Sequence, residues 1–290
     1  MPPTVARIIG GAGTGKTSRL LELMARTIEA GELDPTEIGF VSFTRAARAE
    51  ASGRAADRFG VPQGELERGG WFRTLHSVCH RVLAIGDELL TGKTADRKWM
   101  EESIQEPVSG SGSQGDEGLA AVAFEAAGEA ESALGLWDAA RNRLEPFEAS
   151  WRRADQVNDR TPPLAYCREV VERYEQAKRL DGRCDFVDLL GRFAGWRFGF
   201  DAHTQCRPQG DVPYVPTWFL DEQQDTSALL DEVCRRLIEP ARWVYVVGDP
   251  YQSIYGWAGA DPRHFMDWDV AKEEIMPISF RCPERILRLG

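Results

Sequence analysis

The sequence predicts an α/β fold in which a parallel β-sheet is interrupted by a mostly helical insertion. Short apolar segments alternate with segments of helical periodicity over residues 1–85, which is typical of parallel strands joined by crossover helices. A glycine-rich loop joins the first of these strands to the first helix. Strand signals are lost over residues 86–200 and return in residues 201–290. We therefore predict one α/β domain built from residues 1–85 and 201–290, with residues 86–200 inserted into it.

Six elements are expected before residue 86. Runs of apolar and β-branched residues indicate strands, and apolar residues at helical spacing, such as Leu20, Met24 and Ile28, indicate helices. Gly31 suits the end of the first helix. These signals predict the strands Val5–Ile9, Ile38–Phe43 and Trp71–Thr74, and the helices Ser18–Ala30, Thr44–Phe59 and His76–Ile85.

The insertion shows no convincing strand signal and contains one stretch without helical periodicity. Residues 106–118 are rich in glycine, serine and acidic residues, which predicts a flexible loop. Pro162 and Pro163 suit the start of a helix that runs to about Leu180. After the insertion, strands are expected at Trp218–Leu220 and Trp243–Val247.

Composition and charge narrow the class of protein. The chain is 42% hydrophobic and 28% charged, which is ordinary for a globular protein and excludes a disordered or collagen-like chain. Its apolar runs fall far short of a membrane helix, and no signal peptide is evident. Six widely spaced cysteines predict free thiols in a reducing, cytoplasmic compartment. The net charge of −11 argues against a protein that coats nucleic acid, so a nucleic-acid site would have to be local.

Residues 10–17 read GGAGTGKT and match the phosphate-loop pattern G-x-x-x-x-G-K-[ST] between a predicted strand and helix. Glycines let backbone N–H groups surround phosphate oxygens, and the helix N-terminus adds positive potential. Lys16 is expected to reach the β- and γ-phosphates, and the Thr17 hydroxyl to bind Mg²⁺. The alternative, a glycine-rich turn with an incidental lysine, is disfavoured by the strand–loop–helix context. The predicted nucleotide-binding residues are Gly10, Gly11, Ala12, Gly13, Thr14, Gly15, Lys16 and Thr17.

Two adjacent carboxylates, Asp221 and Glu222, directly follow the predicted strand Trp218–Leu220. They are expected at the carboxyl edge of the sheet, where α/β proteins bind ligands. Asp221 can hold Mg²⁺ through water, and Glu222 can orient and deprotonate an attacking water. The alternative is a helix start capped within Asp225–Ser227, and both interpretations can hold together.

Seven segments, in order along nearly the whole chain, resemble the motifs of the UvrD/Rep/PcrA-like superfamily 1A DNA helicases. A phosphate loop alone would be weak support for that family, whereas the ordered set is strong support. The resemblance implies a RecA-like P-loop NTPase domain, called 1A, with a mostly helical insertion, called 1B. The matching segments are Gly10–Thr17 (motif I), Val41–Glu50 (Ia), Thr74–Ser77 (Ib), Asp185–Leu190 at the end of the insertion, Asp221–Asp225 (II), Val247–Trp257 (III) and Ser279–Pro283 (IV).

The resemblance implies ATP and Mg²⁺ as cofactors, and three further residues at the nucleotide. Gln252 would contact the γ-phosphate and link its state to the DNA side. Arg281 would stabilise the charge that develops on the transferred phosphoryl group. Phe280, where the family usually has tyrosine, would stack on the adenine. The alternative for Phe280 is a core aromatic that follows a strand at Met276–Ile278.

The same resemblance implies contacts with single-stranded DNA from motifs Ia, Ib and III. Aromatic rings can stack on bases, while hydroxyls and arginine can hold phosphates. Trp257 is favoured for stacking, whereas Phe43 could instead belong to the core and His76 could cap or satisfy a buried helix. Of the arginines in the helix Thr44–Arg58, only Arg45 is expected to contact DNA. The predicted DNA-binding residues are Phe43, Thr44, Arg45, Thr74, His76, Tyr255 and Trp257.

Three features depart from the family pattern. The first strand begins at Val5, which leaves no room for the family's upstream glutamine motif that reads adenine. Ala258 stands where family members commonly have arginine. The sequence stops at Gly290, after motif IV, so we expect it to lack the second RecA-like domain with motifs V and VI.

The sequence thus predicts the N-terminal, ATP-binding half of an ATP-dependent 3′–5′ single-stranded DNA translocase or helicase. Its expected partners are single-stranded DNA and a second RecA-like domain or chain, without a membrane. The alternative is a nucleotide-binding regulatory module that has no motor activity and acts through a partner. An unrelated P-loop enzyme, such as a small-molecule kinase, is disfavoured, because the matches to motifs Ia, III and IV would then be coincidental. The sequence does not distinguish DNA repair from replication, recombination or mobile-element biology.

Overall fold

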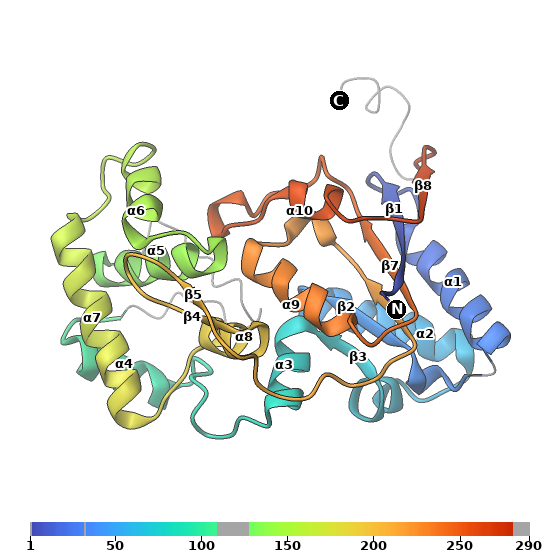
Figure 1. Ribbon diagram of the computed structural model, residues 1–290, viewed down its shortest axis with the longest axis horizontal. Helices are drawn as coiled ribbons and strands as arrows, with labels where there is room; N and C mark the ends of the chain where they lie inside the picture. Colours follow the sequence, from blue (N-terminus) through green and yellow to red (C-terminus); the bar gives the residue numbers. More distant parts are fainter. Residues whose placement is uncertain (1, 32, 109–127, 281–290) are drawn as a thin grey trace.

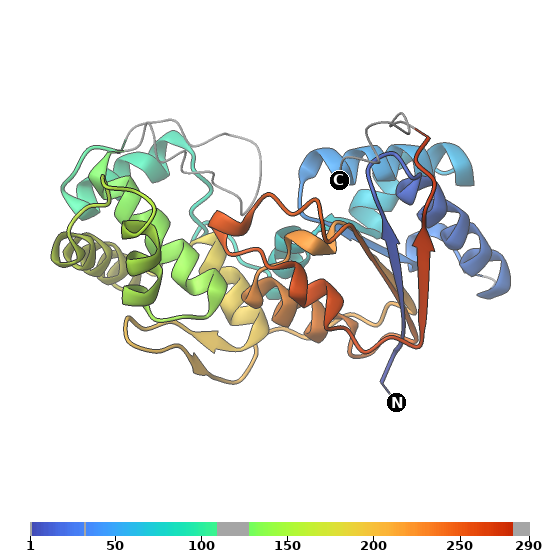
Figure 2. The same ribbon diagram turned by 90° about the horizontal axis from the view of Figure 1, so that it is seen from above.

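Six parallel strands form one sheet in the order β3-β2-β6-β7-β1-β8. The computed structural model describes residues 2–31, 33–108 and 128–280 (Figure 1). The sheet and the helices around it form one side of the molecule, and a helical insertion forms the other (Figures 1 and 2). The α/β fold with a parallel sheet, predicted from the sequence, is confirmed.

The order of the strands in the sheet differs from their order in the chain. The strands β6 and β7, which follow the insertion in sequence, lie between β2 and β1. Each of the five strands predicted by apolar runs is present at its expected place. The strands of this sheet are β1 (Thr4–Gly10), β2 (Gly39–Ser42), β3 (Trp71–Thr74), β6 (Thr217–Leu220), β7 (Trp243–Gly248) and β8 (Lys272–Met276).

The last strand differs from the expectation drawn from the sequence. Strand signals indicated Met276–Ile278, whereas β8 spans Lys272–Met276. This strand lies at the edge of the sheet, where its Glu273 pairs with Arg7 of β1 at 2.6 Å. An edge strand with largely exposed, charged side chains lacks an apolar run, so its sequence does not reveal it.

Successive strand residues point to opposite faces of the sheet and so supply two separate cores. Phe40 and Phe219 pack with α1 and α2 on one face, whereas Val41 and Trp218 pack with α3 and α9 on the other. Because both faces are buried, the central strands read as continuous apolar runs. The helices of this part are α1 (Lys16–Gly31), α2 (Arg45–Phe59), α3 (Leu75–Leu83), α9 (Ala228–Ile238) and α10 (Pro262–Met266).

Gly39 is required where β2 meets β6. A Cβ atom at Gly39 would lie only 2.2 Å from Cε3 of Trp218, a fully buried side chain. We expect Gly39→Ala to lower the free energy of unfolding by about 1–3 kcal/mol, measured by urea denaturation, because the buried indole has no room to move. The matched control is Gly53→Ala on α2, where a Cβ would meet only Gln63 Oε1 at 3.8 Å. The control variant should be at least as stable as the parent, because alanine favours a helix more than glycine does. If Gly39→Ala and Gly53→Ala were equally stable, the predicted clash with Trp218 would be contradicted.

The insertion is mostly helical, as expected, with one small addition. Two-residue strands form an antiparallel hairpin near its end, where no strand was expected. Pro163 precedes the helix α7, in agreement with the predicted helix start. Most of the predicted loop at 106–118 lies outside the described residues. The elements are α4 (Thr94–Ile104), α5 (Glu129–Arg143), α6 (Phe147–Asp155), α7 (Leu164–Asp181), α8 (Phe186–Ala194) and β4 (Trp196–Arg197), and the hairpin partner of β4 is β5 (Thr204–Gln205), which follows residue 200.

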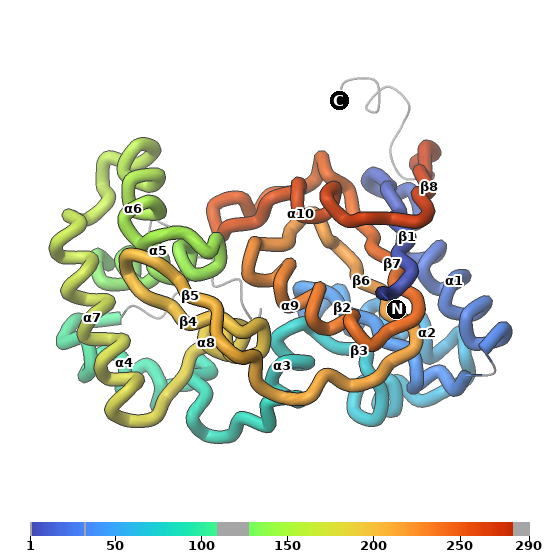
Figure 3. Tube along the Cα trace, in the orientation of Figure 1, coloured from blue at the N-terminus to red at the C-terminus, as the bar shows by residue number. Residues whose placement is uncertain are grey.

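Two groups of apolar contacts organise the insertion. Trp137, Phe147 and Val170 belong to a core shared by α4, α5, α6 and α7. The helix α8 instead places Leu189 and Phe193 in the core beneath α3 and α9. The insertion therefore joins the sheet domain through α8 and also through α5, which contacts α9, and Figure 3 follows the chain from α3 through the insertion and back to β6. Within residues 2–31, 33–108 and 128–280, no helix combines the length and apolarity needed to cross a bilayer.

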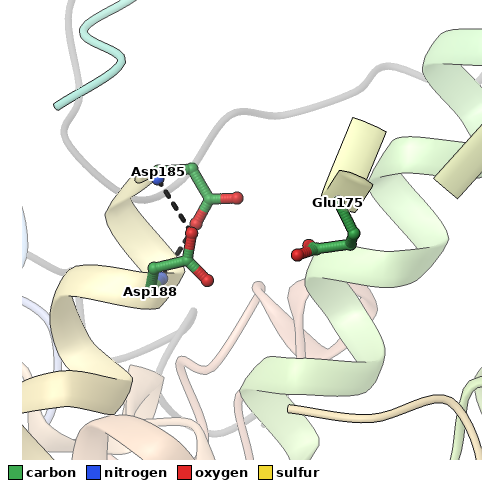
Figure 4. Close-up of side chains that lie close together, drawn as sticks. All are labelled: Glu175, Asp185 and Asp188. Carbon is green, nitrogen blue, oxygen red and sulfur yellow. Dashed lines mark hydrogen bonds between the residues drawn. The ribbon is translucent and has the colours of Figure 1, made fainter. Parts of the chain in front are cut away.

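A buried network of charges joins α5, α7 and α8. The guanidinium of Arg141, whose side chain is completely buried, donates to both Asp185 and Asp188. The ammonium of Lys178 lies 2.8 Å from Glu175 and 2.7 Å from each of the two aspartates. The three carboxylates face one another as metal ligands would (Figure 4), but the lysine already bonds all three. We therefore interpret the network as an ion-pair cluster that holds the three helices together.

Candidate functional site

The phosphate loop occupies the connection between β1 and α1. β1 ends at Gly10 and α1 begins at Lys16, so the predicted residues Gly10–Thr17 form a loop and the first turn of a helix. Gly13 and Gly15 have φ angles of 71° and 87°, which glycine adopts without strain. Lys16 Nζ donates to the carbonyl oxygen of Gly10 at 2.9 Å, which places the ammonium over the loop. Backbone N–H groups, a helix N-terminus and a lysine thus lie together, as a phosphate chain requires.

Asp221 lies at the carboxyl end of β6, on the same edge of the sheet. Its backbone N–H donates to the carbonyl oxygen of Val41 in β2, and its side chain is buried. Burial and the neighbouring Glu222 raise the pKa of Asp221 to about 7, while the charge of Lys16 opposes this shift. Carboxylate and hydroxyl oxygens are ligands that Mg²⁺ accepts, and a cation beside Asp221 would restore the ionised form of this carboxyl group.

Glu222 has an unusual backbone conformation. Its φ angle of 54° lies in the left-handed region, which is uncommon for a residue with a side chain. The side chain is only partly buried, and its Oε2 accepts a hydrogen bond of 2.8 Å from Nε2 of Gln224. A fixed, partly exposed carboxylate next to a buried one can orient and deprotonate water.

Gln224 and Asp249 complete the site, although neither was predicted from the sequence to have a role. Gln224 is buried; it donates to Glu222 and accepts a 2.9 Å hydrogen bond from the backbone N–H of Asp249. It therefore bridges the carboxyl ends of β6 and β7. The Oδ2 atom of Asp249 lies 3.7 Å from the position that a Cβ would take at Gly11. A carboxylate directly after an apolar strand was the signal that identified Asp221, and the same signal was present at Asp249.

Asp225 links the same turn to the segment after β7. Burial raises the pKa of Asp225 to about 6, while hydrogen bonds from the Ser253 hydroxyl and the backbone of Ile254 oppose the shift. The alternative role predicted for Asp225–Ser227 is also present in part, because the side chain of Ser227 caps α9. The acidic turn and the helix cap therefore coexist.

Two further predicted nucleotide residues, Gln252 and Phe280, are exposed. Gln252 is exposed, and its backbone N–H donates to the carbonyl oxygen of Asp249 at 3.0 Å. Phe280 is 82% exposed, so its interpretation as a core aromatic is wrong. Its backbone N–H donates to the carbonyl oxygen of Gly13 at 2.9 Å, which brings the backbone of Phe280 beside the phosphate loop. Arg281 lies outside the described residues.

Three residues predicted to contact DNA lie below the surface. Phe43 belongs to the core between the sheet and α3. The Thr74 hydroxyl accepts from the backbone N–H of Ser77 and so caps α3. His76 is buried with its ring edge-on to Phe186 of the insertion, at 5.7 Å between centroids. We expected Phe43, Thr74 and His76 to contact DNA. Their burial differs from that expectation, since side chains packed in this way present no surface to a base or phosphate.

The other four predicted DNA residues reach the surface. Thr44 caps α2 through its side chain and is partly exposed, and Arg45 beside it is exposed. Trp257 is 40% exposed, and Tyr255 stands edge-on to it with 6.3 Å between ring centroids. Two neighbouring aromatic rings and a basic helix start are chemically suited to bases and phosphates, respectively.

Comparison with known proteins agrees with this geometry. Residues 2–271 match the model of the UvrD/REP helicase N-terminal domain. Relatives include the ATP-dependent DNA helicase PcrA of Staphylococcus epidermidis, 26% identical over 97% of this chain and 36% of the relative. PcrA of Bacillus subtilis is 25% identical, again over 97% of this chain and 36% of the relative. DNA helicase II of Escherichia coli is 26% identical over 97% of this chain and 37% of its own length.

The chain thus spans little more than a third of the length of the curated relatives that it matches. Within that third, the family match covers the phosphate loop, the acidic turn after β6 and the segment after β7. On this combination of sequence match, sheet and site, the chain belongs to the family of UvrD/REP helicase N-terminal domains.

Proposed function

We propose that this chain binds ATP with Mg²⁺ and hydrolyses it as the N-terminal part of a 3′–5′ single-stranded DNA translocase or helicase. The observation that carries the proposal is the convergence of three chain segments at one sheet edge. The phosphate loop, the Asp221–Glu222 turn and Asp249 meet there, and Gln224 bridges two of them. The direction of movement rests on the family resemblance.

In the proposed mechanism, the backbone N–H groups of residues 10–17 and Lys16 hold the phosphate chain. Thr17 and Asp221 hold Mg²⁺, which would supply neutralising charge to the phosphates. Glu222 orients an attacking water and accepts its proton, and Gln224 fixes the carboxylate that does so.

Other residues complete the nucleotide site in the same proposal. Gln252 contacts the γ-phosphate, and Arg281 stabilises the charge that develops on the transferred phosphoryl group. Phe280 stacks on the adenine. Its backbone hydrogen bond to Gly13 supports this role, because it holds the main chain of a residue with an exposed ring beside the phosphate loop.

Single-stranded DNA is the proposed polymeric partner. We confine the proposed contacts to Thr44, Arg45, Tyr255 and Trp257, because these reach the surface. Stacking on Trp257 would be tolerant of sequence, as a translocase requires. A second RecA-like domain or chain is the proposed partner that completes the ATP site.

We also propose the division into a 1A domain, residues 1–85 and 201–290, and a 1B insertion, residues 86–200. The separate apolar core of α4, α5, α6 and α7 supports this division. A reducing, cytoplasmic compartment is proposed as well. Its support is that Cys79, Cys167, Cys184 and Cys234 are buried free thiols.

The test is ATP hydrolysis by this chain with and without single-stranded DNA, with Lys16→Ala as the blank. We expect Mg²⁺-dependent ATP binding, slow turnover that the blank lacks, and weak, salt-sensitive binding of single strands. Turnover as fast as that of an intact motor would contradict the proposed dependence on a second domain. Failure to bind ATP would overturn the whole proposal, and ATP binding with no response to DNA would favour the regulatory alternative.

A further inference from the structure

We propose that Arg143, at the end of α5 in the insertion, is a positioning residue that fixes the turn Gly256–Trp257 and thereby holds Trp257 ready for single-strand binding. The inference deepens the proposed function and rests on it where DNA is concerned. It assigns to the insertion a direct part in building the DNA surface of the sheet domain.

Arg143 is aimed at this turn by the end of its helix. α5 ends at Arg143, and the next residue, Leu144, has a left-handed φ of 52° that turns the chain away. The Arg143 side chain is only 15% exposed. Its Nη1 donates to the hydroxyl of Ser150 at 3.1 Å and lies 3.6 Å from Glu145 Oε1. These two neighbours therefore fix the guanidinium through Nη1.

The other side of the guanidinium holds two successive carbonyl groups. Nη2 of Arg143 donates to the carbonyl oxygen of Gly256 at 2.9 Å and to that of Trp257 at 2.8 Å. The aliphatic part of the side chain packs on the turn as well, because a Cβ at Gly259 would lie 3.1 Å from Arg143 Cγ. The turn's own residue after the tryptophan is Ala258, which carries no charge, so the cation comes from the insertion.

The turn is also attached to the segment that follows the acidic residues. The backbone N–H of Asp261 donates to the carbonyl oxygen of Thr226, and Ser227 forms a β-bridge with Ala260. Ser227 also donates to Asn142, the residue before Arg143. The end of α5 therefore touches both segments, and a contiguous set of contacts connects the insertion, the Trp257 turn and the turn that carries Glu222.

Two properties distinguish a positioning role from a direct contact with DNA. A residue that acts through Trp257 has no further effect on DNA affinity once Trp257 is removed. The losses of affinity caused by the two substitutions are then not additive. A residue that pairs with a phosphate lowers the salt dependence of binding by about one counterion when it is removed, whereas a positioning residue leaves that dependence unchanged.

The first measurement needs no DNA. We expect Arg143→Ala to speed amide hydrogen exchange in the segment 255–260 by roughly tenfold, the usual effect of losing a charged hydrogen bond. Arg143→Lys should also raise exchange, because an ammonium cannot reproduce the planar fork of guanidinium donors. The matched control is Arg152→Ala on α6, an exposed arginine that pairs with Glu148, and its exchange should match the parent. Unchanged exchange in Arg143→Ala would overturn the inference.

The second measurement is the Kd of a labelled oligothymidine for the parent chain, Arg143→Ala, Trp257→Ala and the double variant. We expect Trp257→Ala to weaken binding by roughly tenfold, Arg143→Ala by less, and the double variant no more than Trp257→Ala. Additive losses, or a flatter salt dependence in Arg143→Ala, would overturn the positioning role in favour of a direct contact. If the parent binds no oligonucleotide while the exchange result holds, the proposed function fails and the structural role of Arg143 stands.

Discussion

Glu222→Gln is expected to bind ATP and Mg²⁺ as the parent does and to hydrolyse ATP about 10²- to 10⁴-fold more slowly, the usual contribution of a general base. Glutamine keeps an oxygen that can accept the hydrogen bond from Gln224, so the turn at the end of β6 should persist. What is lost is the ability to take a proton from water. Binding is measured with a fluorescent ATP analogue, and turnover by release of phosphate.

The matched control is Glu239→Gln at the exposed end of α9, which makes the same chemical change away from the site. It should leave both binding and turnover at the parent level. Lys16→Ala should differ from Glu222→Gln by losing nucleotide affinity as well, because it removes the ammonium above the phosphate loop. Hydrolysis at the parent rate by Glu222→Gln would remove this residue as the base.

Arg141→Met is expected to lower the free energy of unfolding by about 3–5 kcal/mol, because the partly buried carboxylates of Asp185 and Asp188 lose a completely buried cationic partner. The completely buried guanidinium of Arg141 contacts Asp185 and Asp188, and afterwards only Lys178 would neutralise them. The loss is measured by urea denaturation. The matched control is Arg179→Met, at an exposed position of α7, which should change stability little.

Within this network, Asp185 makes stability depend on pH in a defined direction, whereas burial and the charge of Asp185 raise the pKa of Asp188 and so act in the opposite direction. Burial alone raises the pKa of Asp185, but Arg141 and Lys178 outweigh burial and hold it well below its ordinary value. A carboxylate whose pKa is lower in the folded state adds stability above its unfolded pKa and loses it as the pH falls. The parent should therefore lose stability below about pH 5, the range in which an unfolded carboxyl group begins to bind protons. As the pH falls through this range, the free energy of unfolding should decrease less in Arg141→Met than in the parent. An equal decrease would contradict the assignment of this pH dependence to Asp185.

Strand positions were predictable from the sequence because the central strands are buried on both faces. Phe40 and Val41, or Trp218 and Phe219, are apolar neighbours that serve opposite cores, and the resulting apolar run is visible in the sequence. The edge strand β8 has no such run and was placed wrongly. Apolar patterning therefore locates strands well where both faces are covered, and poorly at an edge.

The candidate site was predictable where chemistry is local in sequence. The phosphate loop and the Asp221–Glu222 pair are contiguous segments at strand ends, and the structure brings them together. Gln224 was missed because its role depends on Asp249, which comes from a different strand. For His76 the sequence left a DNA contact and a buried position open, because the ring it packs on, Phe186, comes from the insertion. A single sequence does not reveal which distant segment will cover a given side chain.

The placement of β6 and β7 has a consequence for synthesis on the ribosome. These two strands lie side by side between β2 and β1, so β1 and β2 cannot belong to one sheet until residues 217–248 have emerged. The phosphate loop is among the first segments made, yet its carboxylate partners arrive only after the whole insertion. Nascent chains that end within the insertion should therefore be unable to retain ATP, and the long-range pairing of Gly39 with Trp218 should make completion of the sheet a late and slow event.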